Sequence, residues 1–263
     1  INNRPPDGAP GAYTVMRAEN PGMAVIDGEN INNPCNFEEG NAQYLEWYGL
    51  IFCRSAGSVV SLQGQSNTNR LHHFKMRRCG IFDANNEDLI YNEQVRIRFV
   101  SQMLFEDLYV WGNGRYQYYI LDCDSIILRR CIDRYDRGVG IESCQGSFRL
   151  YGSNYVYLQN CISIDGPPPQ YLLTHDGDNV LRTSAEPKAL WISSNPSTNN
   201  LGSHNVANGC IFMNLGMPWV AGYSEKGVTF DNHIINSVFW GMGEAFRNRN
   251  PYVTDNVFFD HCL

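Results

Sequence analysis

Charged side chains recur at one position of a repeated segment, and they are the first candidates for chemistry. Arg77, Glu106 and Arg129 occupy this position in three successive segments, and Lys75 lies two residues before Arg77. If the segments stack as strands, the three charges lie side by side with alternating sign. Such a row is either an ion-pair ladder, in which each exposed pair contributes under ~1 kcal/mol, or a row of cations that binds the carboxylates of an acidic polysaccharide.

Acidic residues form a second group of candidates. Asp122 and Asp124 in Leu-Asp-Cys-Asp-Ser point to one face if this segment is a strand, and two carboxylates on one face could bind Ca²⁺. Aspartates also form turns, which is the alternative for this pair. Expected loops supply further carboxylates and an imidazole, namely Asp133, Asp136, His175, Asp176 and Asp178. No spacing rule selects an acid/base pair among them.

Aromatic side chains are candidates for stacking on sugar rings. Trp111 and Trp219 fall in expected turns or loops, and Tyr157 falls at an outward position of its segment. These three are the predicted glycan-binding residues. Trp47 and Trp240 align instead with apolar positions and are predicted to lie in the core.

Eight segments with one shared apolar pattern must position these residues. They align on Leu50, Cys79, Leu108, Cys131, Cys161, Cys210, Val238 and Val257. Like the aligned residue, the positions five and three before it and two after it are mostly apolar. Apolar residues therefore alternate with other residues on both sides of the bend, and the two alternating runs are out of phase by one residue. The pattern predicts two short strands that meet at a bend. Most expected bend residues are small or turn-tolerant, namely Gly49, Arg78, Asp107, Arg130, Asn160, Gly209, Ser237 and Asn256.

The spacing of the segments predicts a β-helix. Successive aligned residues mostly lie roughly 20–30 residues apart, which is the length of one coil of such a solenoid. The interval between Cys161 and Cys210 is longer and opens with Pro167-Pro168-Pro169. We therefore expect a loop excursion over about residues 165–186 and a return to the helix near Lys188.

The alignment also predicts the surroundings of the cysteines and of the outward side chains. Four cysteines at the aligned position should stack in the core as small hydrophobic residues, namely Cys79, Cys131, Cys161 and Cys210. The better disulfide candidates lie off this position, namely Cys35, Cys53, Cys123, Cys144 and Cys262. Four residues before the aligned position, an outward stripe becomes apolar, namely Glu46, Lys75, Leu104, Ile127, Tyr157, Val206, Ile234 and Val253. Such a stripe predicts a cover of loops, another chain or sugar rings.

Composition excludes some classes of protein. The chain has 263 residues, a net charge of −7 and a pI near 5.3, so it lacks the basic surface of a general nucleic-acid binder. It has no run of about 18 apolar residues that would predict a membrane span. The repeat pattern starts and stops without a capping helix. We therefore expect either part of a longer chain or copies that associate laterally or head to tail, and head-to-tail contacts produce an open filament.

The run YTVMRAENPGMAVIDG from Tyr13, followed by YLEWYGLIFCRSAG from Tyr44, resembles the opening coils of the pectate-lyase-like right-handed β-helix superfamily. Alginate-lyase-like and chondroitinase-like enzymes and many surface proteins belong to that superfamily. The resemblance implies an all-β fold, a single-stranded right-handed parallel β-helix of about nine to ten coils. Residues 1–263 are expected to form one domain, and its ends are expected to be uncapped because the repeat pattern starts and stops without a capping helix.

The resemblance also implies an enzyme hypothesis, a polysaccharide lyase that cleaves a uronate glycan by β-elimination. That reaction needs a cation, Arg or Ca²⁺, beside the uronate carboxylate, a base for the sugar proton and an acid for the leaving oxygen. Lys75, Arg77 and Arg129 suit the first two roles, and Asp122 and Asp124 would hold Ca²⁺. The hydrolase branch of the superfamily is not favoured, because its Asn-Thr-Asp, Asp-Asp and Gly-His-Gly signatures do not occur.

Three functions follow from these expectations. The first is an extracellular or cell-surface structural or adhesive protein that assembles end to end into fibres, which would account for the uncapped ends and the apolar stripe. The alternative is the polysaccharide lyase. The second alternative is a carbohydrate-binding module that uses exposed aromatic residues. Fold alone does not choose among them.

Overall fold

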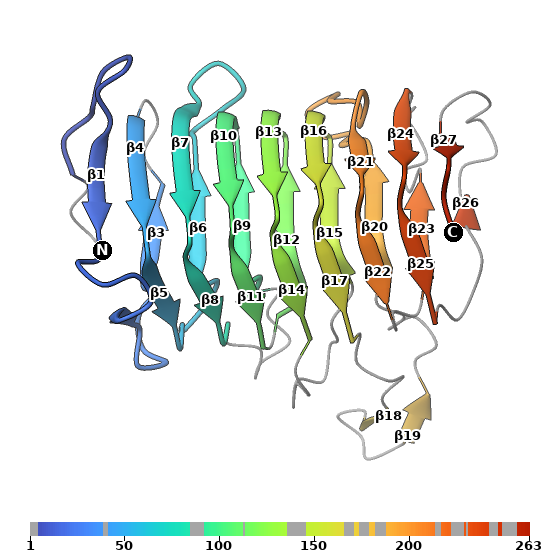
Figure 1. Ribbon diagram of the computed structural model, residues 1–263, viewed down its shortest axis with the longest axis horizontal. Helices are drawn as coiled ribbons and strands as arrows, with labels where there is room; N and C mark the ends of the chain where they lie inside the picture. Colours follow the sequence, from blue (N-terminus) through green and yellow to red (C-terminus); the bar gives the residue numbers. More distant parts are fainter. Residues whose placement is uncertain are drawn as a thin grey trace.

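The computed structural model describes residues 5–38, 42–84, 92–112, 114–135, 146–165, 171–173, 179–181, 188–213, 217–221, 229, 231–241, 247–248 and 257–263. Parallel strands stack into three sheets along the long axis of the molecule (Figure 1). Sheet 1 contains β1 (Thr14–Arg17), β4 (Gln43–Tyr48), β7 (Leu71–Arg77), β10 (Val100–Glu106), β13 (Asp124–Arg129), β16 (Asn154–Gln159), β21 (Val206–Asn208), β24 (Asn232–Ile235) and β27 (Val257–Asp260).

After each sheet 1 strand from β1 to β24, the chain adds one strand to sheet 2 and one to sheet 3. Sheet 2 contains β2 (Ala24–Asp27), β5 (Leu50–Cys53), β8 (Gly80–Phe82), β11 (Tyr109–Trp111), β14 (Ile132–Arg134), β17 (Ile162–Ile164), β22 (Ile211–Met213) and β25 (Val238–Trp240). Sheet 3 contains β3 (Cys35–Phe37), β6 (Val60–Gln63), β9 (Val95–Arg98), β12 (Tyr116–Leu121), β15 (Gly146–Tyr151), β20 (Lys188–Ser193), β23 (Met217–Ala221) and β26 (Arg247–Asn248). The chain is a right-handed parallel β-helix, and the predicted fold class is confirmed.

From the second coil on, one left-handed residue follows each strand of sheet 1 and makes the bend toward sheet 2. These residues have φ between +49° and +71° and are Gly49, Arg78, Asp107, Arg130, Asn160, Gly209, Asn236 and His261. The first six are the predicted bend residues. Glycine adopts this conformation without strain, and asparagine and aspartate tolerate it better than most residues.

The predicted register is wrong by one residue in the coil of β24 and β25. The bend falls at Asn236 rather than at Ser237, and β24 pairs His233 with Val206. A one-residue slip moves every side chain to the opposite face of a strand. Ile234, predicted to point outward, is therefore in the core, whereas Trp240, predicted to be buried, is 67% exposed. The last bend likewise falls at His261 rather than at Asn256.

Cysteine side chains form a row inside the solenoid. Cys79, Cys131, Cys161 and Cys210 are buried as predicted. The thiols of the last three donate to carbonyl groups of the preceding coil, at Sγ–O distances of 3.6, 3.4 and 3.6 Å. All eight cysteines in the described part of the chain are unpaired.

The predicted disulfides are therefore corrected. Cys35, Cys53, Cys123 and Cys262 form no disulfide, and Cys144 lies outside the described residues. Cys262 directly follows the bend residue His261. It therefore occupies the position of the stacked cysteines, where the misaligned register of the last coil did not place it. Its thiol donates to the carbonyl of Ile234 in the preceding coil (3.4 Å).

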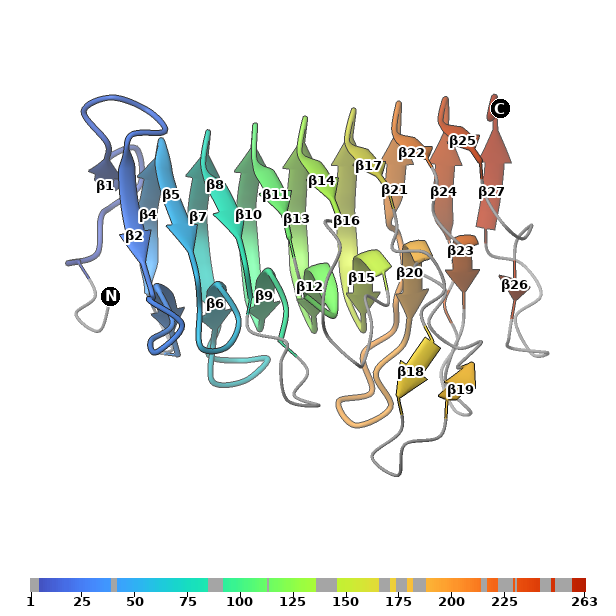
Figure 2. The ribbon, with the colours of Figure 1, turned by 90° about the horizontal axis from the view of Figure 1, so that it is seen from below.

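The longer interval contains an antiparallel pair of strands outside the solenoid. β17 ends at Ile164 and β20 begins at Lys188. Between them, β18 (Tyr171–Leu173) pairs with β19 (Asn179–Leu181), and the two project from the body of the helix (Figure 1, Figure 2). Asp136, Pro167–Pro169, His175, Asp176, Asp178 and Val253 lie outside the described residues. No helix in the described ranges is long and apolar enough to cross a membrane.

One acidic side chain lies inside the core. Asp133 belongs to β14, not to a loop as predicted, and it points inward because it alternates with the outward Ile132 and Arg134. Ser163 Oγ donates to its Oδ2 (2.9 Å), and the hydroxyl groups of Ser163 and Ser147 are hydrogen-bonded. Its Oδ1 has no hydrogen-bond partner. Burial raises the pKa of the Asp133 carboxyl to about 7, and the nearby hydroxyl groups of Ser147 and Ser163, which act to lower it, offset only part of this effect.

Replacement of Asp133 by asparagine should stabilise the protein at high pH. The folded protein holds the Asp133 proton far more tightly than the unfolded chain, whose pKa is near 3.8. The carboxyl therefore lowers the free energy of unfolding progressively as the pH rises from about 4 to about 7, by up to about 4 kcal/mol above pH 7. Asp133→Asn, neutral throughout, should have a higher urea midpoint than the parent above pH 7 and lose that advantage near pH 4. An advantage that does not change with pH would contradict this.

Candidate functional site

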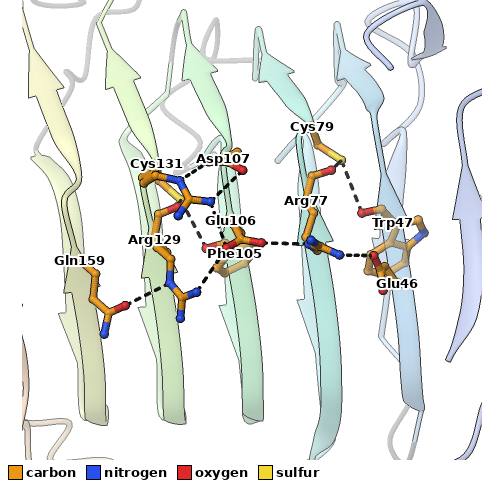
Figure 3. A network of polar contacts seen from close by, with 11 residues as sticks. Glu46, Trp47, Arg77, Cys79, Phe105, Glu106, Asp107, Arg129, Cys131 and Gln159 are labelled. Atoms are coloured by element: carbon orange, nitrogen blue, oxygen red, sulfur yellow. Dashed lines mark hydrogen bonds and ion pairs between the residues drawn. The ribbon is translucent and has the colours of Figure 1, made fainter. Parts of the chain in front are cut away.

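Arg77, Glu106 and Arg129 lie side by side on the outer face of sheet 1, as their common position predicts (Figure 3). Arg77 donates to Glu106 from Nε (3.0 Å) and to Glu46 from Nη1 (3.1 Å). Arg129 donates to Glu106 from Nη1 (3.4 Å) and to Gln159 from Nε (3.1 Å). The contacts form a continuous ladder from β4 to β16, which is the ion-pair alternative of the two that the sequence left open.

Glu106 is the acid on which three arginines converge. The third is Arg130, whose Nη2 donates to Glu106 (3.1 Å) and whose Nε donates to Asp107 (2.6 Å). Glu106 is only 8% exposed, whereas each arginine side chain is partly exposed. The hydrogen bond to Glu106 raises the pKa of Arg77, and the hydrogen bond from Arg130 lowers the pKa of Asp107.

Lys75 lies on the same outer face but takes no part in the ladder. Its ammonium group is 3.7 Å from the centroid of the Tyr13 ring. The register places Lys75 between Glu46 and Leu104. Lys75, Arg77 and Arg129 are thus brought to one face, although the two arginines are already bound to Glu106. Their assignment as catalytic residues stays a prediction.

Asp122 and Asp124 differ in their surroundings. β12 ends at Leu121 and β13 begins at Asp124, so Asp122 lies in the bend between sheets 3 and 1, with φ +52°. The alternation that would bring both carboxylates to one face therefore does not apply. Asp122 is fully buried, whereas Asp124 is partly exposed and accepts a hydrogen bond from Ser125 (2.6 Å).

The buried carboxylate of Asp122 holds a surface turn in place. It accepts hydrogen bonds from Asn195 Nδ2 (2.9 Å), Thr198 Oγ1 (2.7 Å) and Asn200 Nδ2 (2.8 Å). Ca²⁺ requires six to eight oxygen ligands, and here donor groups take up both carboxylate oxygens. Among the described residues, no three acidic, histidine or cysteine side chains are grouped as a metal site would require. These residues fit the turn-forming role better than a Ca²⁺ site.

The predicted glycan-binding residues lie on three different sheets. Trp111 is in β11 of sheet 2, where its ring stacks on Phe82 with centroids 4.3 Å apart. Trp219 is in β23 of sheet 3, in register with Leu190. Both tryptophans are in strands rather than in the predicted turns or loops. Tyr157 is on the outer face of sheet 1, in register between Ile127 and Val206. The three do not form one site.

Sheet 3 carries a row of side chains that the sequence patterns above did not single out. Ser61, Arg96, Tyr119, Arg149 and Trp191 are in register across five adjacent strands. Their neighbours along the strands, such as Ile97 and Ile120, belong to the core. Because side chains alternate between the two faces of a strand, the row points outward. Adjacent members are separated by about 4.8 Å along the helix axis, the spacing of paired strands.

Arg149 is the unusual member of this row. Only 6% of the residue is exposed, and its guanidinium carbon lies 3.7 Å from the centroid of the Trp191 ring and 4.7 Å from that of the Tyr151 ring. Its Nη1 is buried without a hydrogen-bond partner, and no carboxylate of the described residues forms an ion pair with it. Burial lowers the pKa of the guanidinium. A buried cation without an acidic partner is costly, and such groups concentrate at functional sites.

Glu93 is a buried acid beside this row. It lies just before β9, where Ser58 Oγ donates to its Oε2 (3.1 Å) and Arg96 Nη1 lies 3.9 Å from Oε2. Burial raises the pKa of the Glu93 carboxyl to about 7, although Arg96, Ser58 and Arg115 act to lower it. The group can therefore take up or release a proton near neutral pH.

Two tyrosines complete the group. The rings of Tyr116 and Tyr119 stack with centroids 5.3 Å apart, and Tyr116 meets the edge of Trp191 at 6.3 Å. Burial raises the pKa of Tyr119 to about 12 and also raises the pKa of Tyr116, so both phenols keep their protons at neutral pH. The charges of Arg149, Glu93 and Arg96 all act on Tyr119. We call these residues the Arg149 cluster, namely Glu93, Arg96, Tyr116, Tyr119, Arg149 and Trp191.

The sequence does contain a signal for most of this cluster. Four segments share apolar first and third residues, namely Val95-Arg-Ile-Arg98, Tyr118-Tyr-Ile-Leu121, Phe148-Arg-Leu-Tyr151 and Leu190-Trp-Ile-Ser193. Their alignment as a third strand of the coil would bring Arg96, Tyr119, Arg149 and Trp191 into one row. Glu93 has no such signal, because its importance comes from its burial in the folded chain.

Comparison with known proteins gives a likeness of fold. No protein-family model and no curated protein matches the sequence. Similar solved structures include an alginate lyase from Paenibacillus sp. str. FPU-7, with a TM-score of 0.45 and 10% identity over 97% of this chain and 85% of that chain. A mannuronic-acid-specific polysaccharide family 6 lyase from human gut microbiota has a TM-score of 0.43 and 14% identity over 97% and 70%.

An endo-xylogalacturonan hydrolase from Aspergillus tubingensis has a TM-score of 0.44 and 9% identity over 95% of this chain and 84% of that chain. At these identities the likeness concerns the fold alone. Any activity must be argued from the residues of this chain.

Loss of the Glu106 charge should destabilise the protein more than loss of the Asp107 charge. Glu106→Gln leaves three arginines without their shared acid, and we expect the free energy of unfolding to fall by about 1–2 kcal/mol, because the arginines remain partly exposed to water. Asp107→Asn changes the charge equally but removes a partner of Arg130 alone. Denaturant unfolding of both variants at low salt compares them. Equal losses would show that Glu106 does not hold the ladder together.

Proposed function

We propose that the outer face of sheet 3 binds an acidic polysaccharide and cleaves it by β-elimination at the Arg149 cluster. The observation that carries the proposal is the buried guanidinium of Arg149, which has no carboxylate partner in the described part of the chain. A uronate carboxylate would supply the missing anion. The row from Arg96 to Trp191 runs along the helix axis, which is the direction in which the proposed glycan would lie.

Charge neutralisation is the first requirement of the reaction. The proton at C5 of a uronate becomes acidic enough to remove only when the negative charge that develops on the adjacent carboxylate is stabilised. Arg149 suits this role because Trp191 and Tyr151 hold its guanidinium in place before substrate arrives. Arg96, two strands away in the row, is a second cation for the carboxylate of a neighbouring sugar.

Proton transfer is the second requirement. With a pKa of about 7, the Glu93 carboxylate can act as the base that takes the C5 proton. The C4–O bond then breaks and a C4–C5 double bond forms. Tyr119, whose phenol keeps its proton at neutral pH, gives that proton to the departing oxygen. The reaction therefore needs no co-reactant.

Sheet 1 offers a weaker basis for the same chemistry. Arg77 and Arg129 already share the Glu106 carboxylate, so a uronate would have to displace or add to existing ion pairs. Lys75 lies over the Tyr13 ring rather than beside an acid. Neither observation leaves an unmatched cation of the kind that Arg149 provides.

An acidic polysaccharide substrate also favours an extracellular or cell-surface location. The fibre-forming structural role and the carbohydrate-binding module remain predictions beside the lyase. A binding module would require affinity for the same glycans without product. End-to-end fibres would be visible in electron micrographs of the purified chain.

Removal of the Arg149 charge should abolish lyase activity. Arg149→Gln keeps a polar side chain but cannot neutralise a uronate, so kcat/KM should fall at least about 100-fold. The assay is the ultraviolet absorbance of the unsaturated product from alginate, pectate or chondroitin.

Arg77→Gln makes the same charge change on sheet 1 and should retain activity, as should Lys75→Ala. Loss of activity in these two variants with survival in Arg149→Gln would move the site to sheet 1. Glycan binding without product, lost in Arg149→Gln, would indicate a binding module.

The pH dependence of activity should report the Glu93 carboxyl. If its carboxylate is the base, kcat/KM rises with pH up to about 7 and is level above it, because the protonated acid cannot accept the C5 proton. Glu93→Gln should lower kcat/KM by roughly 100-fold or more and remove the inflection near 7. A pH profile that is unchanged in Glu93→Gln would exclude Glu93 as the base.

A further inference from the structure

The outer face of sheet 2 carries two parallel rows of apolar side chains. The first row follows the register of eight strands, namely Val25, Ile51, Gly80, Tyr109, Ile132, Ile162, Ile211 and Val238. The second row lies two residues further along each strand, namely Asp27, Cys53, Phe82, Trp111, Arg134, Ile164, Met213 and Trp240. Only two of these sixteen positions carry a charged side chain. We call the two rows together the sheet 2 face.

This face is exposed to solvent at several points. Val25, Tyr109 and Trp240 are 54%, 41% and 67% exposed, and most of the remaining side chains are partly exposed. The outer face of sheet 1 also carries apolar residues, such as Leu104 and Ile127, but these lie beside the ion ladder, and the outer face of sheet 3 carries the Arg149 cluster. Contiguous apolar patches of this extent on a soluble protein mark interaction surfaces.

The dimensions of the sheet 2 face suit a second copy of itself. Eight strands at about 4.8 Å spacing make it about 34 Å long. Burial of two such faces against each other would remove on the order of 1,000 Å² of accessible surface in total, which is at the lower limit for a specific interface. A partner must match a strip that is long, narrow and nearly uncharged, and another sheet 2 face has the same length, repeat and polarity.

We propose that two copies of the chain associate through their sheet 2 faces, related by a two-fold axis. Such an interface is self-complementary, so the same patch serves on both copies. Given the modest area, the dimer is expected to be weak, with a Kd on the order of micromolar. This inference does not depend on the proposed lyase site, which is on sheet 3.

One arrangement also matches the sizes of the facing side chains. If the two-fold axis is parallel to the strands, the order of coils is reversed in the second copy, and the fourth strand of one sheet lies opposite the fifth strand of the other. This arrangement puts Ile162 opposite Gly80, so a large side chain meets the position that has none, and it puts Ile51 opposite Ile211.

The matched pair of variants is Ile132→Glu and Ile127→Glu. Both isoleucines point outward, are partly exposed and belong to one coil, with Ile132 on sheet 2 and Ile127 on sheet 1. Sedimentation velocity over a concentration series should show a monomer–dimer equilibrium for the parent protein and for Ile127→Glu. Ile132→Glu should remain monomeric at every concentration. Circular dichroism checks that both variants fold, and Ile132→Thr serves as a milder variant, expected to weaken dimerisation at least tenfold.

A monomeric parent protein throughout the concentration range would overturn the proposal. So would dimers or fibres that persist in Ile132→Glu, because they would use another surface. The coil order has its own test, since the double variant Ile51→Cys/Ile211→Cys should form disulfide-linked dimers on oxidation, whereas Ile51→Cys/Ile127→Cys should not. Absence of that cross-link in a dimer that Ile132→Glu abolishes would overturn the reversed order of coils.

Discussion

Each coil of this protein must repeat the path of the coil before it, because the backbone hydrogen bonds of all three sheets run between coils. The constraint extends through the bend between sheets 1 and 2. There the amides of the left-handed residues from Gly49 to Asn236 each donate to a carbonyl of the next coil, for example Arg78 to Glu106 (2.9 Å) and Asp107 to Arg129 (3.0 Å). A left-handed conformation is unfavourable for such residues by themselves. An interior bend is hydrogen-bonded to the coil before it and to the coil after it. The unfavourable conformation of one bend residue is therefore stabilised by its neighbours, and the bend residues keep the coils in register.

Because the coils are in register, residues at equivalent positions stack, and the chemistry of the surface is organised in rows. Stacked thiols suit the core, since they are small and their weak donors reach carbonyls of the previous coil. Stacked like charges would repel each other at about 4.8 Å. The charges in a row therefore either alternate in sign or lack an opposite charge beside them. Sheet 1 follows the first course through Arg77, Glu106 and Arg129, which are in register. Sheet 3 does not, because tyrosine rather than an acid separates Arg96 from Arg149.

Rows of this kind could be predicted where the sequence repeats a pattern of fixed length. The bends from Gly49 to Gly209 and the buried cysteines followed from one alignment, as did the adjacency of Arg77, Glu106 and Arg129. The coil of β24 was misaligned because an apolar residue, Val238, was taken as the residue after the bend, whereas backbone conformation places the bend at Asn236. Period-two patterns do not tolerate such an error, and Ile234 and Trp240 changed sides together.

The Arg149 cluster was beyond the same alignment for a physical reason. The segments between sheet 2 and sheet 3 differ in length from coil to coil, so the third strand has no constant distance from the first two. Burial of Glu93 depends on residues from other coils, and no local pattern reports it. Asp133 lies two residues after Cys131, where the alignment itself predicts an inward side chain.

The two buried acids illustrate how the same pKa can have different meanings. Burial raises the pKa of both carboxyls to about 7. Asp133 lies inside the solenoid against Ser163, where a glycan cannot reach, so its proton affects only the stability of the fold. Glu93 lies beside an outward row that contains an arginine without an acid partner. A shifted carboxyl can act in catalysis only where substrate, cation and proton donor can meet it, and the site proposed on sheet 3 requires this of Glu93, Arg149 and Tyr119.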